Sequence, residues 1–382
     1  MPEINQFKGE VWPRKVAKKL LGKPFCSNSV ADFPSSDDFQ DLCFSTEEFV
    51  SSNIRPSGDQ QKVTRKYKLF ASTWNVAGIP PSDNLDLEDW LDTRDNSYDI
   101  YVLGFQEVVP LNAKNVLGPE NNTISMKWNS LIKTTLNKHS NSFHSIISKQ
   151  MVGIMVSVWV RNDLLPSIRH PSVSFVGCGI MGFLGNKGSV SLSFLLHETS
   201  FCIVCCHLAS GGKEGDEINR NSNAMEIFSR TRFSSGPSLD LPRKIYDHER
   251  IILLGDLNYR ISLPDEETRS LVLQKEWDIL LKKDQLRGEI MEGRTFGGWN
   301  EGDINFSPTY KYYLNSDEYY GIVQGRKGEK KRAPAWCDRI LSYGTGLNQT
   351  GYDRCESKHS DHRPVRATFN VEVEFLKRSN SS

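Results

Sequence analysis

Three short stretches of the chain carry residues that could hydrolyse a phosphate ester. PAWCDRIL, at residues 334–341, places Asp338 on a short apolar strand just after a run rich in lysine and arginine. SDHRPV, at residues 360–365, adds a second carboxylate and an imidazole, and GDLNYRI, at residues 255–261, adds a third carboxylate and an amide. Metal-assisted attack of water on a phosphate uses side chains of these types. The combination therefore indicates a metal-dependent phosphate hydrolase.

The roles of four polar residues follow from what this chemistry requires. Mg²⁺ prefers carboxylate and carbonyl oxygens and retains several waters, so Glu107 with help from Asn75 is the expected anchor for the cation. Asp256, assisted by Asn258, is the expected base for the attacking water. Taken alone, each of these residues could simply end a strand or form a turn, where polar residues are common. Their joint occurrence favours the functional interpretation.

Asp338 and His362 are expected to form a pair. A carboxylate that accepts a hydrogen bond from one ring nitrogen of His362 would fix its tautomer and leave the other nitrogen facing a phosphate oxygen. The alternative is that residues 361–362 form a turn before Pro364. This segment alone does not decide between the two.

Apolar runs that predict β-strands dominate the chain from residue 63 onward. The predicted strands span residues 68–77, 99–108, 145–160, 173–180, 188–196, 200–208, 250–257, 336–343 and 365–375. Helical patterns lie between them, at residues 85–91, 125–136, 223–232 and 268–286. Many strands with interspersed helices indicate a layered α/β (α+β) domain.

Polar residues lie near the ends of four of these strands, after their apolar residues: Asn75, Glu107, His207 and Asp256. One polar group after an apolar strand means little. Four such groups predict a shared rim, where strand ends converge on a pocket.

Composition divides the 382 residues into three parts. Residues 1–62 are rich in Ser, Asp, Gln, Lys and Pro and are expected to be an irregular N-terminal segment. Residues 63–378 form the expected catalytic domain, and residues 379–382 a short tail. A basic stretch at residues 12–21 is expected to be a solvated helix, the alternative being contact with a membrane or a partner.

Charge and targeting signals restrict the class of protein. The 47 basic and 47 acidic residues cancel, which argues against a dedicated nucleic-acid binder. No signal peptide, membrane span or prenylation box is visible, so we expect a monomeric cytoplasmic protein, soluble or peripheral on membranes, and not secreted. The eight cysteines are then expected to be reduced thiols. Residues 202–207 lack the second Cys/His pair of a zinc site.

The chain resembles the inositol polyphosphate 5-phosphatases of the exonuclease/endonuclease/phosphatase superfamily, in their plant-like type I single-domain form. GDLNYRI and PAWCDRIL together match the signature of that family. Further matches follow in family order: TWNVAG (73–78), FQEV (105–108), LGNKG (184–188), CHLASG (206–211), PTYKY (308–312) and SDHRPV (360–365). The resemblance implies a DNase I-like fold, a four-layer αββα sandwich of two mixed β-sheets flanked by helices.

The resemblance also implies an activity and further site residues. The activity would be Mg²⁺-dependent hydrolysis of the 5-phosphate of a phosphoinositide, such as phosphatidylinositol 4,5-bisphosphate or 3,4,5-trisphosphate, or of a soluble inositol polyphosphate. His207 would contact the scissile phosphate, and Asp361 would lie in the metal shell. Basic residues that match the positions gripping the other phosphates in the family are Lys187, Lys311, Lys330, Arg332 and Arg339. Arg220 and Asn221 match an Arg-Asn pair of the family and are also expected to bind substrate.

A glycine-rich apolar loop at residues 177–185 resembles a family loop that touches lipid, although its side chains could instead pack inward.

Two rival functions share much of the pattern of site residues. A Mg²⁺-dependent endonuclease of the same fold would use the same core residues, but PAWCDRIL and the balanced charge argue against it. A non-catalytic phosphoinositide-binding module would have lost metal or base positions, and none is missing.

Overall fold

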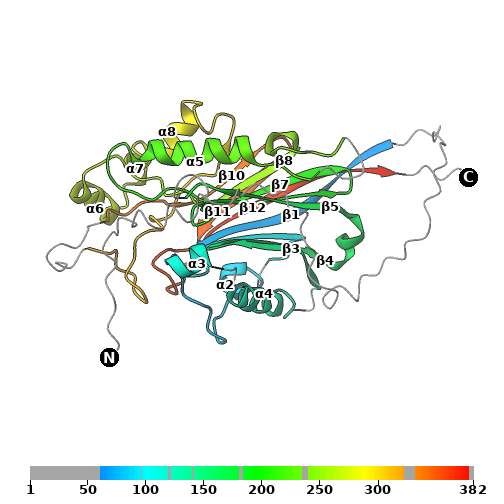
Figure 1. Ribbon diagram of the computed structural model, residues 1–382, viewed down its shortest axis with the longest axis horizontal. Helices are drawn as coiled ribbons and strands as arrows, with labels where there is room; N and C mark the ends of the chain where they lie inside the picture. Colours follow the sequence, from blue (N-terminus) through cyan, green and yellow to red (C-terminus); the bar gives the residue numbers. More distant parts are fainter. Residues whose placement is uncertain are drawn as a thin grey trace, which may run out of the picture. The chain divides into compact units, whose positions relative to one another are not determined.

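The computed structural model describes residues 61–94, 96–118, 122–139, 142–179, 184–234, 240–321 and 332–377. Within these residues, two six-stranded sheets pack face to face, with helices on both outer sides (Figure 1). The predicted four-layer αββα sandwich of two mixed sheets is therefore confirmed. The predicted N-terminal segment, most of which precedes residue 61, and the tail at residues 379–382 lie outside the described residues.

The first sheet contains both ends of the described chain. Its strand order is β11 (Leu347–Arg354), β12 (Val365–Lys377), β1 (Gln61–Asn75), β2 (Ile100–Gln106), β4 (Ile154–Arg161) and β3 (Phe143–Met151). β1 runs parallel to β2 and antiparallel to β12. The carboxyl ends of β1 and β2 and the amino end of β12 consequently lie at the same edge of this sheet.

The second sheet has the same arrangement at its centre. Its strand order is β5 (Ile168–Gly177), β6 (Gly188–Leu196), β7 (Thr199–His207), β8 (Arg250–Asp256), β10 (Asp338–Tyr343) and β9 (Asn300–Glu301). β7 runs parallel to β8, and β10 pairs antiparallel with β8. The carboxyl ends of β7 and β8 therefore meet the amino end of β10.

Helices cover the outer face of each sheet (Figure 1). On the side of the first sheet lie α2 (Glu88–Leu91), α3 (Ala113–Leu117) and α4 (Thr123–Leu136). On the side of the second sheet lie α5 (Asp216–Arg230), α6 (Asp265–Leu273), α7 (Trp277–Leu281) and α8 (Gln285–Met291). Two short 3₁₀ helices, η1 (Asn162–Ser167) and η3 (Ile245–Asp247), precede β5 and β8.

The central strands are apolar on both faces because both faces are buried. In β1, Leu69 and Ala71 belong to the core between the sheets, whereas Phe70 and Trp74 pack toward α2 and α4. The strands of the second sheet alternate in the same way between the inter-sheet core and the side of α5 and α8. Successive side chains of a strand point to opposite faces, so a strand covered on both sides reads as an unbroken apolar run.

The predicted strands are present, but one predicted strand and one predicted helix are each divided into shorter elements in the structure. The predicted strand at residues 145–160 is the hairpin of β3 and β4, which turns at Val152 in the left-handed region (φ 54°). The predicted helix at residues 268–286 is instead parts of α6, α7 and α8. Lys275 adopts φ 59° after α6, and the Asp284 side chain accepts a hydrogen bond from Arg287 N and begins a new helix.

Two further sequence predictions bear on the described chain. No helix among the described residues is long and apolar enough to cross a membrane. The six cysteines of the described chain are free thiols and all are buried: Cys178, Cys202, Cys205, Cys206, Cys337 and Cys355.

Candidate active site

The strand ends bring the predicted polar residues together at one rim. Asn75 ends β1, and Glu107 follows β2 next to it. His207 and Asp256 end β7 and β8 and are direct partners in the parallel ladder. Asp338 begins β10 opposite Asp256. The predicted convergence of strand ends is thus present in the structure.

Asp256 lies at the centre of this rim and is 2% exposed. Its Oδ2 atom accepts a hydrogen bond from Asn75 Nδ2 at 3.0 Å and lies 3.2 Å from His207 Nε2, and its Oδ1 atom accepts from Asn258 N at 3.1 Å. Burial acts to raise the pKa of Asp256, but the hydrogen bond with His207 and nearby positive charges outweigh burial and hold the pKa well below its usual value. Asp256 is therefore ionised at neutral pH.

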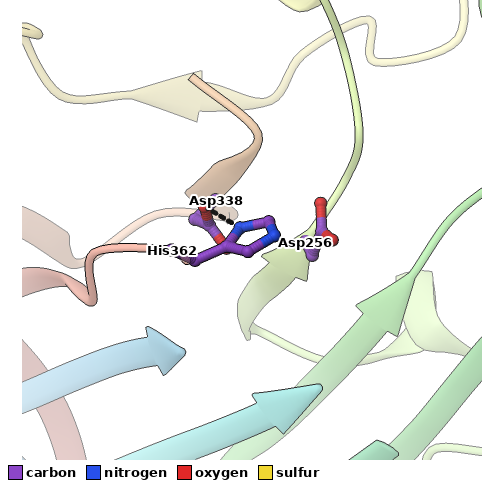
Figure 2. A group of neighbouring side chains, drawn as sticks. All are labelled: Asp256, Asp338 and His362. Carbon is purple, nitrogen blue, oxygen red and sulfur yellow. Dashed lines mark hydrogen bonds and ion pairs between the residues drawn. The ribbon is translucent and has the colours of Figure 1, made fainter. Parts of the chain in front are cut away.

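Asp338 and His362 form the predicted pair across from Asp256 (Figure 2). His362 Nδ1 donates to Asp338 Oδ2 at 2.9 Å, and Thr309 Oγ1 donates to the same oxygen at 2.7 Å. The imidazole ring lies between the two carboxylates and packs on the Tyr310 ring, with centroids 4.5 Å apart. Burial acts to lower the pKa of His362, but the charges of the surrounding carboxylates raise it to about 9. Although burial also raises the pKa of Asp338, we assign the shared proton to the imidazole.

His207 and Lys187 lie next to each other beside Asp256. His207 is 1% exposed, and its Nε2 atom contacts both Lys187 Nζ and Asp256 Oδ2. Burial and the charge of Lys187 lower the pKa of His207, and burial likewise lowers the pKa of Lys187. His207 is consequently neutral at physiological pH, with a ring nitrogen close to the Asp256 carboxylate.

Glu107 presents a carboxylate suited to a cation. Its side chain accepts no hydrogen bond from the residues that the structure describes, and its Oε1 atom lies 3.9 Å from His207 Nε2. Its backbone has φ 53°, a left-handed conformation that is uncommon for a residue with a side chain and is often found at functional sites. A hydrogen bond from Gly78 N to Glu107 O, at 2.7 Å, holds that conformation.

The donor set at the rim fits a hard divalent cation. Among the described residues, the ligand atoms of Asp256, Asp338 and His362 lie within 4.8 Å of one another. Because Asp338 and His362 bind each other, this proximity reflects their hydrogen bond rather than a three-ligand metal site. The carboxylates of Glu107 and Asp256 offer the oxygen ligands that hard cations prefer.

Asp361 and Lys311 form an ion pair next to His362. Lys311 Nζ donates to Asp361 Oδ2, and Asp361 Oδ1 lies 4.0 Å from His362 Nε2. Burial acts to raise the pKa of Asp361, but the charges of His362 and Lys311 outweigh it and lower the pKa. The structure therefore brings one predicted metal-shell residue and one predicted substrate-binding residue to the rim as partners.

The other predicted substrate-binding residues lie in different surroundings. Arg332 is partly exposed near Gly212, and Lys330 lies outside the described residues. Arg220 is fully buried, where its guanidinium donates to Gly211 O and Gln285 Oε1. Asn221 Oδ1 accepts a hydrogen bond from the Tyr259 hydroxyl. Arg220 and Asn221 thus bind protein groups beside the rim.

Arg339 does not face the rim, which corrects its assignment to substrate binding. Its side chain is buried, with Nη1 2.9 Å from Asp284 Oδ1 and Nη2 2.5 Å from Glu301 Oε2. Neighbouring residues of a strand point to opposite faces, so Arg339 points away when Asp338 points toward His362. Its charge stabilises the fold by pairing α8 and β9 with β10.

Sequence reasoning missed three residues that support the catalytic groups. Arg260 Nη2 donates to Asn258 Oδ1 at 2.6 Å, and its guanidinium lies 4.7 Å from the centre of the Tyr310 ring. Thr309 and Tyr310 contact the Asp338–His362 pair, as described above. All three lie in stretches that match the family pattern, GDLNYRI and PTYKY, which is the signal that could have identified them.

Comparisons with known proteins agree with this geometry. Residues 72–368 match the profile described as "Endonuclease/Exonuclease/phosphatase family 2". The chain is 57% identical to type IV inositol polyphosphate 5-phosphatase 9 of Arabidopsis thaliana, over 96% of this chain and 93% of the relative. It is 48% identical to type I inositol polyphosphate 5-phosphatase 8 of the same plant, over 86% and 77% of the two chains.

Solved structures support the same relationship. The crystal structure of the inositol polyphosphate 5-phosphatase domain of SPsynaptojanin, in complex with inositol (1,4)-bisphosphate and a calcium ion, has a TM-score of 0.72. It is 31% identical and covers 82% of this chain and 87% of its own. Cimex nitrophorin, at 21% identity and a TM-score of 0.60, shares the fold alone. The DNase I-like fold implied by the sequence resemblance is confirmed.

Proposed function

Because the chain belongs to the inositol polyphosphate 5-phosphatase family and is a phosphoric monoester hydrolase, we propose that it uses Mg²⁺ to remove the 5-phosphate of a phosphoinositide or a soluble inositol polyphosphate. Phosphatidylinositol 4,5-bisphosphate and 3,4,5-trisphosphate are the expected lipids. The main support is the position of His362, whose ring lies between the ionised Asp256 and the hydrogen-bonded Asp338 (Figure 2).

Asp256 orients the attacking water. Its low pKa keeps it ionised, so it accepts a hydrogen bond from the water and aims a lone pair of the water oxygen at phosphorus. Phosphoryl transfer passes through a loose transition state in most descriptions, so orientation matters more than early proton removal. Asn75 and Asn258 fix the carboxylate through bonds to its two oxygens.

His362 supplies positive charge on the other side of the phosphate. With Nδ1 bound to Asp338, the protonated Nε2 donates to a non-bridging oxygen and stabilises charge that develops there. His207 and Lys187, beside Asp256, lie where they can contact the same group. Cys337 is not suited to act as a nucleophile, because burial raises its pKa and keeps it a thiol. The attacking group is therefore water.

Glu107, with Asn75 and Asp361 nearby, would hold Mg²⁺. The cation would supply charge neutralisation for the phosphate oxygens. The SPsynaptojanin domain was crystallised with calcium, which is also a hard, oxygen-preferring ion, and this supports the use of a divalent cation here.

The remaining phosphates of the ring are assigned to Lys311 and Arg332, with Lys330 in a stretch outside the described residues. The bisphosphate bound to the SPsynaptojanin domain keeps its 1- and 4-phosphates and lacks a 5-phosphate, which is the composition of a 5-phosphatase product. Cationic side chains that form charge-assisted hydrogen bonds suit such a polyanion. Arg339 is left out of this set because its partners are Asp284 and Glu301.

We further propose that the protein is a cytoplasmic monomer that contacts membrane surfaces through the loop at residues 177–185. The loop flanks Lys187 of the rim and contains several apolar residues in its sequence. Residues 180–183 of this loop lie outside the described residues, so the support comes from sequence alone. An apolar tip beside a phosphate site would suit a lipid substrate whose headgroup lies at the membrane surface.

Phosphate release tests this function directly. The purified chain is incubated with Mg²⁺ and a panel of phosphoinositides in vesicles and soluble inositol phosphates, and inorganic phosphate is measured with malachite green. Release from 5-phosphorylated members, and not from matched members without a 5-phosphate, is the expected result. Release from none of them, or faster cleavage of plasmid DNA, would reject the proposal.

A further inference from the structure

The ladder between β1, which ends at Asn75, and β12, which begins three residues after His362, stops just before the active site. β1 and β12 form a continuous antiparallel ladder that ends at the pair Thr73 and Val365. Pro364, the residue before β12, has no N–H and cannot donate to a ladder. The segments that hold Asn75 and His362 therefore need other contacts to fix their separation.

Side chains replace the missing ladder through two reciprocal hydrogen bonds. Trp74 Nε1 donates to His362 O at 3.3 Å. In the opposite direction, Ser360 Oγ donates to Asn75 O at 2.6 Å, and the same hydroxyl accepts from His362 N at 3.2 Å. Ser360 is fully buried. One hydroxyl thus binds the main chain of both Asn75 and His362.

A third contact extends this connection. His359 Nε2 donates to Ile79 O at 3.3 Å, and the His359 ring packs edge-on against Trp74 and Trp128, with centroids 5.6 and 5.8 Å apart. Trp74 and Trp128 are both almost completely buried beneath the rim. The segment that precedes His362 is therefore fixed to the Asn75 loop on both sides of Ser360.

We propose that Ser360 is a positioning residue that sets the separation of the Asn75 amide and the His362 imidazole around Asp256. Asn75 Nδ2 donates to Asp256, and the ligand atom of His362 lies within 4.8 Å of the same carboxylate. A displacement of about 1 Å at reacting groups can reduce a rate by roughly 100-fold. Loss of the Ser360 hydroxyl frees two main-chain groups that control two such side chains.

The chain contains a matched control for this hydroxyl. Ser72 is also fully buried, and its Oγ atom donates to Val365 O at 2.7 Å and accepts from Trp90 Nε1 at 2.7 Å. Ser72 therefore joins β1 to β12 and to α2 through two hydrogen bonds and touches neither Asn75 nor His362. The Ser360 hydroxyl makes two main-chain bonds and also lies 3.4 Å from Asp361 Oδ1. The two alanine variants lose similar interactions and differ in what those interactions position.

The test compares Ser360→Ala with Ser72→Ala in the full chain. The inference rests on the proposed function, so phosphate release by the wild type is measured in the same assay, and its absence would reject that function itself. Both variants should show a similar decrease in Tm. Only Ser360→Ala should lose kcat, by about 10- to 100-fold, with KM changed less than about threefold.

Two further variants test the same role of Ser360 if Ser360→Ala is poorly folded. Ser360→Thr retains the hydroxyl and should recover at least part of the lost kcat. Trp74→Phe removes the reciprocal N–H and should lower kcat in the same way, with little change in KM. Equal kcat in Ser360→Ala and Ser72→Ala, or a rise in KM at unchanged kcat, would overturn the positioning role.

Discussion

His362 Nδ1 lies 2.9 Å from Asp338 Oδ2, in a bond buried from solvent. The negative charges around His362 outweigh its burial and raise its pKa to about 9, so the imidazole is a cation throughout the physiological range. A permanently protonated Nε2 suits stabilisation of an anionic phosphate better than exchange of protons with it. This relationship leads to the first prediction.

Activity should fall at alkaline pH as His362 loses its proton. The protonated form is the active one, so kcat/KM should be retained below about pH 9 and decline as the pH rises through that value. In Asp338→Asn the charge that raises the pKa of His362 is gone, so the decline should move to lower pH. Phosphate release measured as a function of pH checks this. An identical alkaline limb in the two proteins would contradict the assigned role of His362.

Removing the charge of Asp256 should abolish turnover while the fold remains. Asp256→Asn keeps the shape of the side chain but weakens its hold on the attacking water, so kcat should fall by about 10³-fold or more. Circular dichroism should be unchanged. Asp265→Asn, which alters a carboxylate paired with Arg269 in α6, is the control and should retain wild-type kcat. Residual activity of Asp256→Asn near that of the control would disprove the mechanism.

Arg339 should contribute to stability and not to substrate affinity. Arg339→Ala leaves Asp284 and Glu301 buried without their partner, and removing one member of a buried ion pair costs about 3–5 kcal/mol. Urea unfolding should show this loss, and the folded fraction should have the wild-type KM. Lys311→Ala provides the contrast, with a raised KM for inositol polyphosphates. A large increase in KM for Arg339→Ala would return this residue to the substrate site.

The stability of the fold should decrease below about pH 6.5. His248 is buried, its Nδ1 atom contacts Lys244 O, and its Nε2 atom accepts a hydrogen bond from Ser193 Oγ at 2.7 Å. Burial lowers the pKa of His248, so the unfolded chain binds a proton more readily than the folded one. This contribution is present above the unfolded pKa and is lost as the pH falls through and below it. Urea midpoints at pH 7.5 and 5.5 should differ less in His248→Gln than in the wild type.

Chelation should abolish phosphate release, and Mg²⁺ should restore it. Glu107→Gln removes a carboxylate oxygen that hard cations prefer, so the Mg²⁺ concentration for half-maximal activity should rise by about 10-fold or more. Glu226→Gln, which alters a partly exposed carboxylate that pairs with Arg230 on α5, is the control. An unchanged Mg²⁺ requirement in Glu107→Gln would show that the cation is held elsewhere.

The rim of the site could be predicted from sequence because its residues directly follow apolar strands. Asn75, Glu107, His207 and Asp256 each stand at the end of a mostly apolar run. Parallel neighbours bring the strand ends together in two pairs, Asn75 with Glu107 and His207 with Asp256, and the packing of the two sheets joins the pairs. The pairing of Asp338 with His362 was likewise predicted, from residue types.

The errors have equally local causes. The side-chain alternation of β10 excludes Arg339 from the rim once Asp338 faces it, whereas its assignment to substrate binding rested on the family resemblance alone. The break after α6 depends on the left-handed backbone of Lys275. Lysine does not favour that conformation, so its presence in the sequence does not predict the break. Contacts such as Arg260 with Tyr310 join segments far apart in sequence, and no periodicity reports them.

Two contacts at the centre of the site join one sheet to the other, Asn75 with Asp256 and His362 with Asp338. Asn75, Glu107 and His362 belong to the edge of the first sheet, whereas Asp256, His207 and Asp338 belong to the second. The spacing of these pairs is therefore the spacing of the sheets, which the inter-sheet core determines. Gly104 illustrates the tolerance: an added Cβ atom would lie 2.0 Å from Leu254 Cδ1 of the opposite sheet. A change in the volume of the apolar side chains between the sheets should therefore change the distances between catalytic groups. Such substitutions should alter kcat although the substituted residues do not contact the substrate.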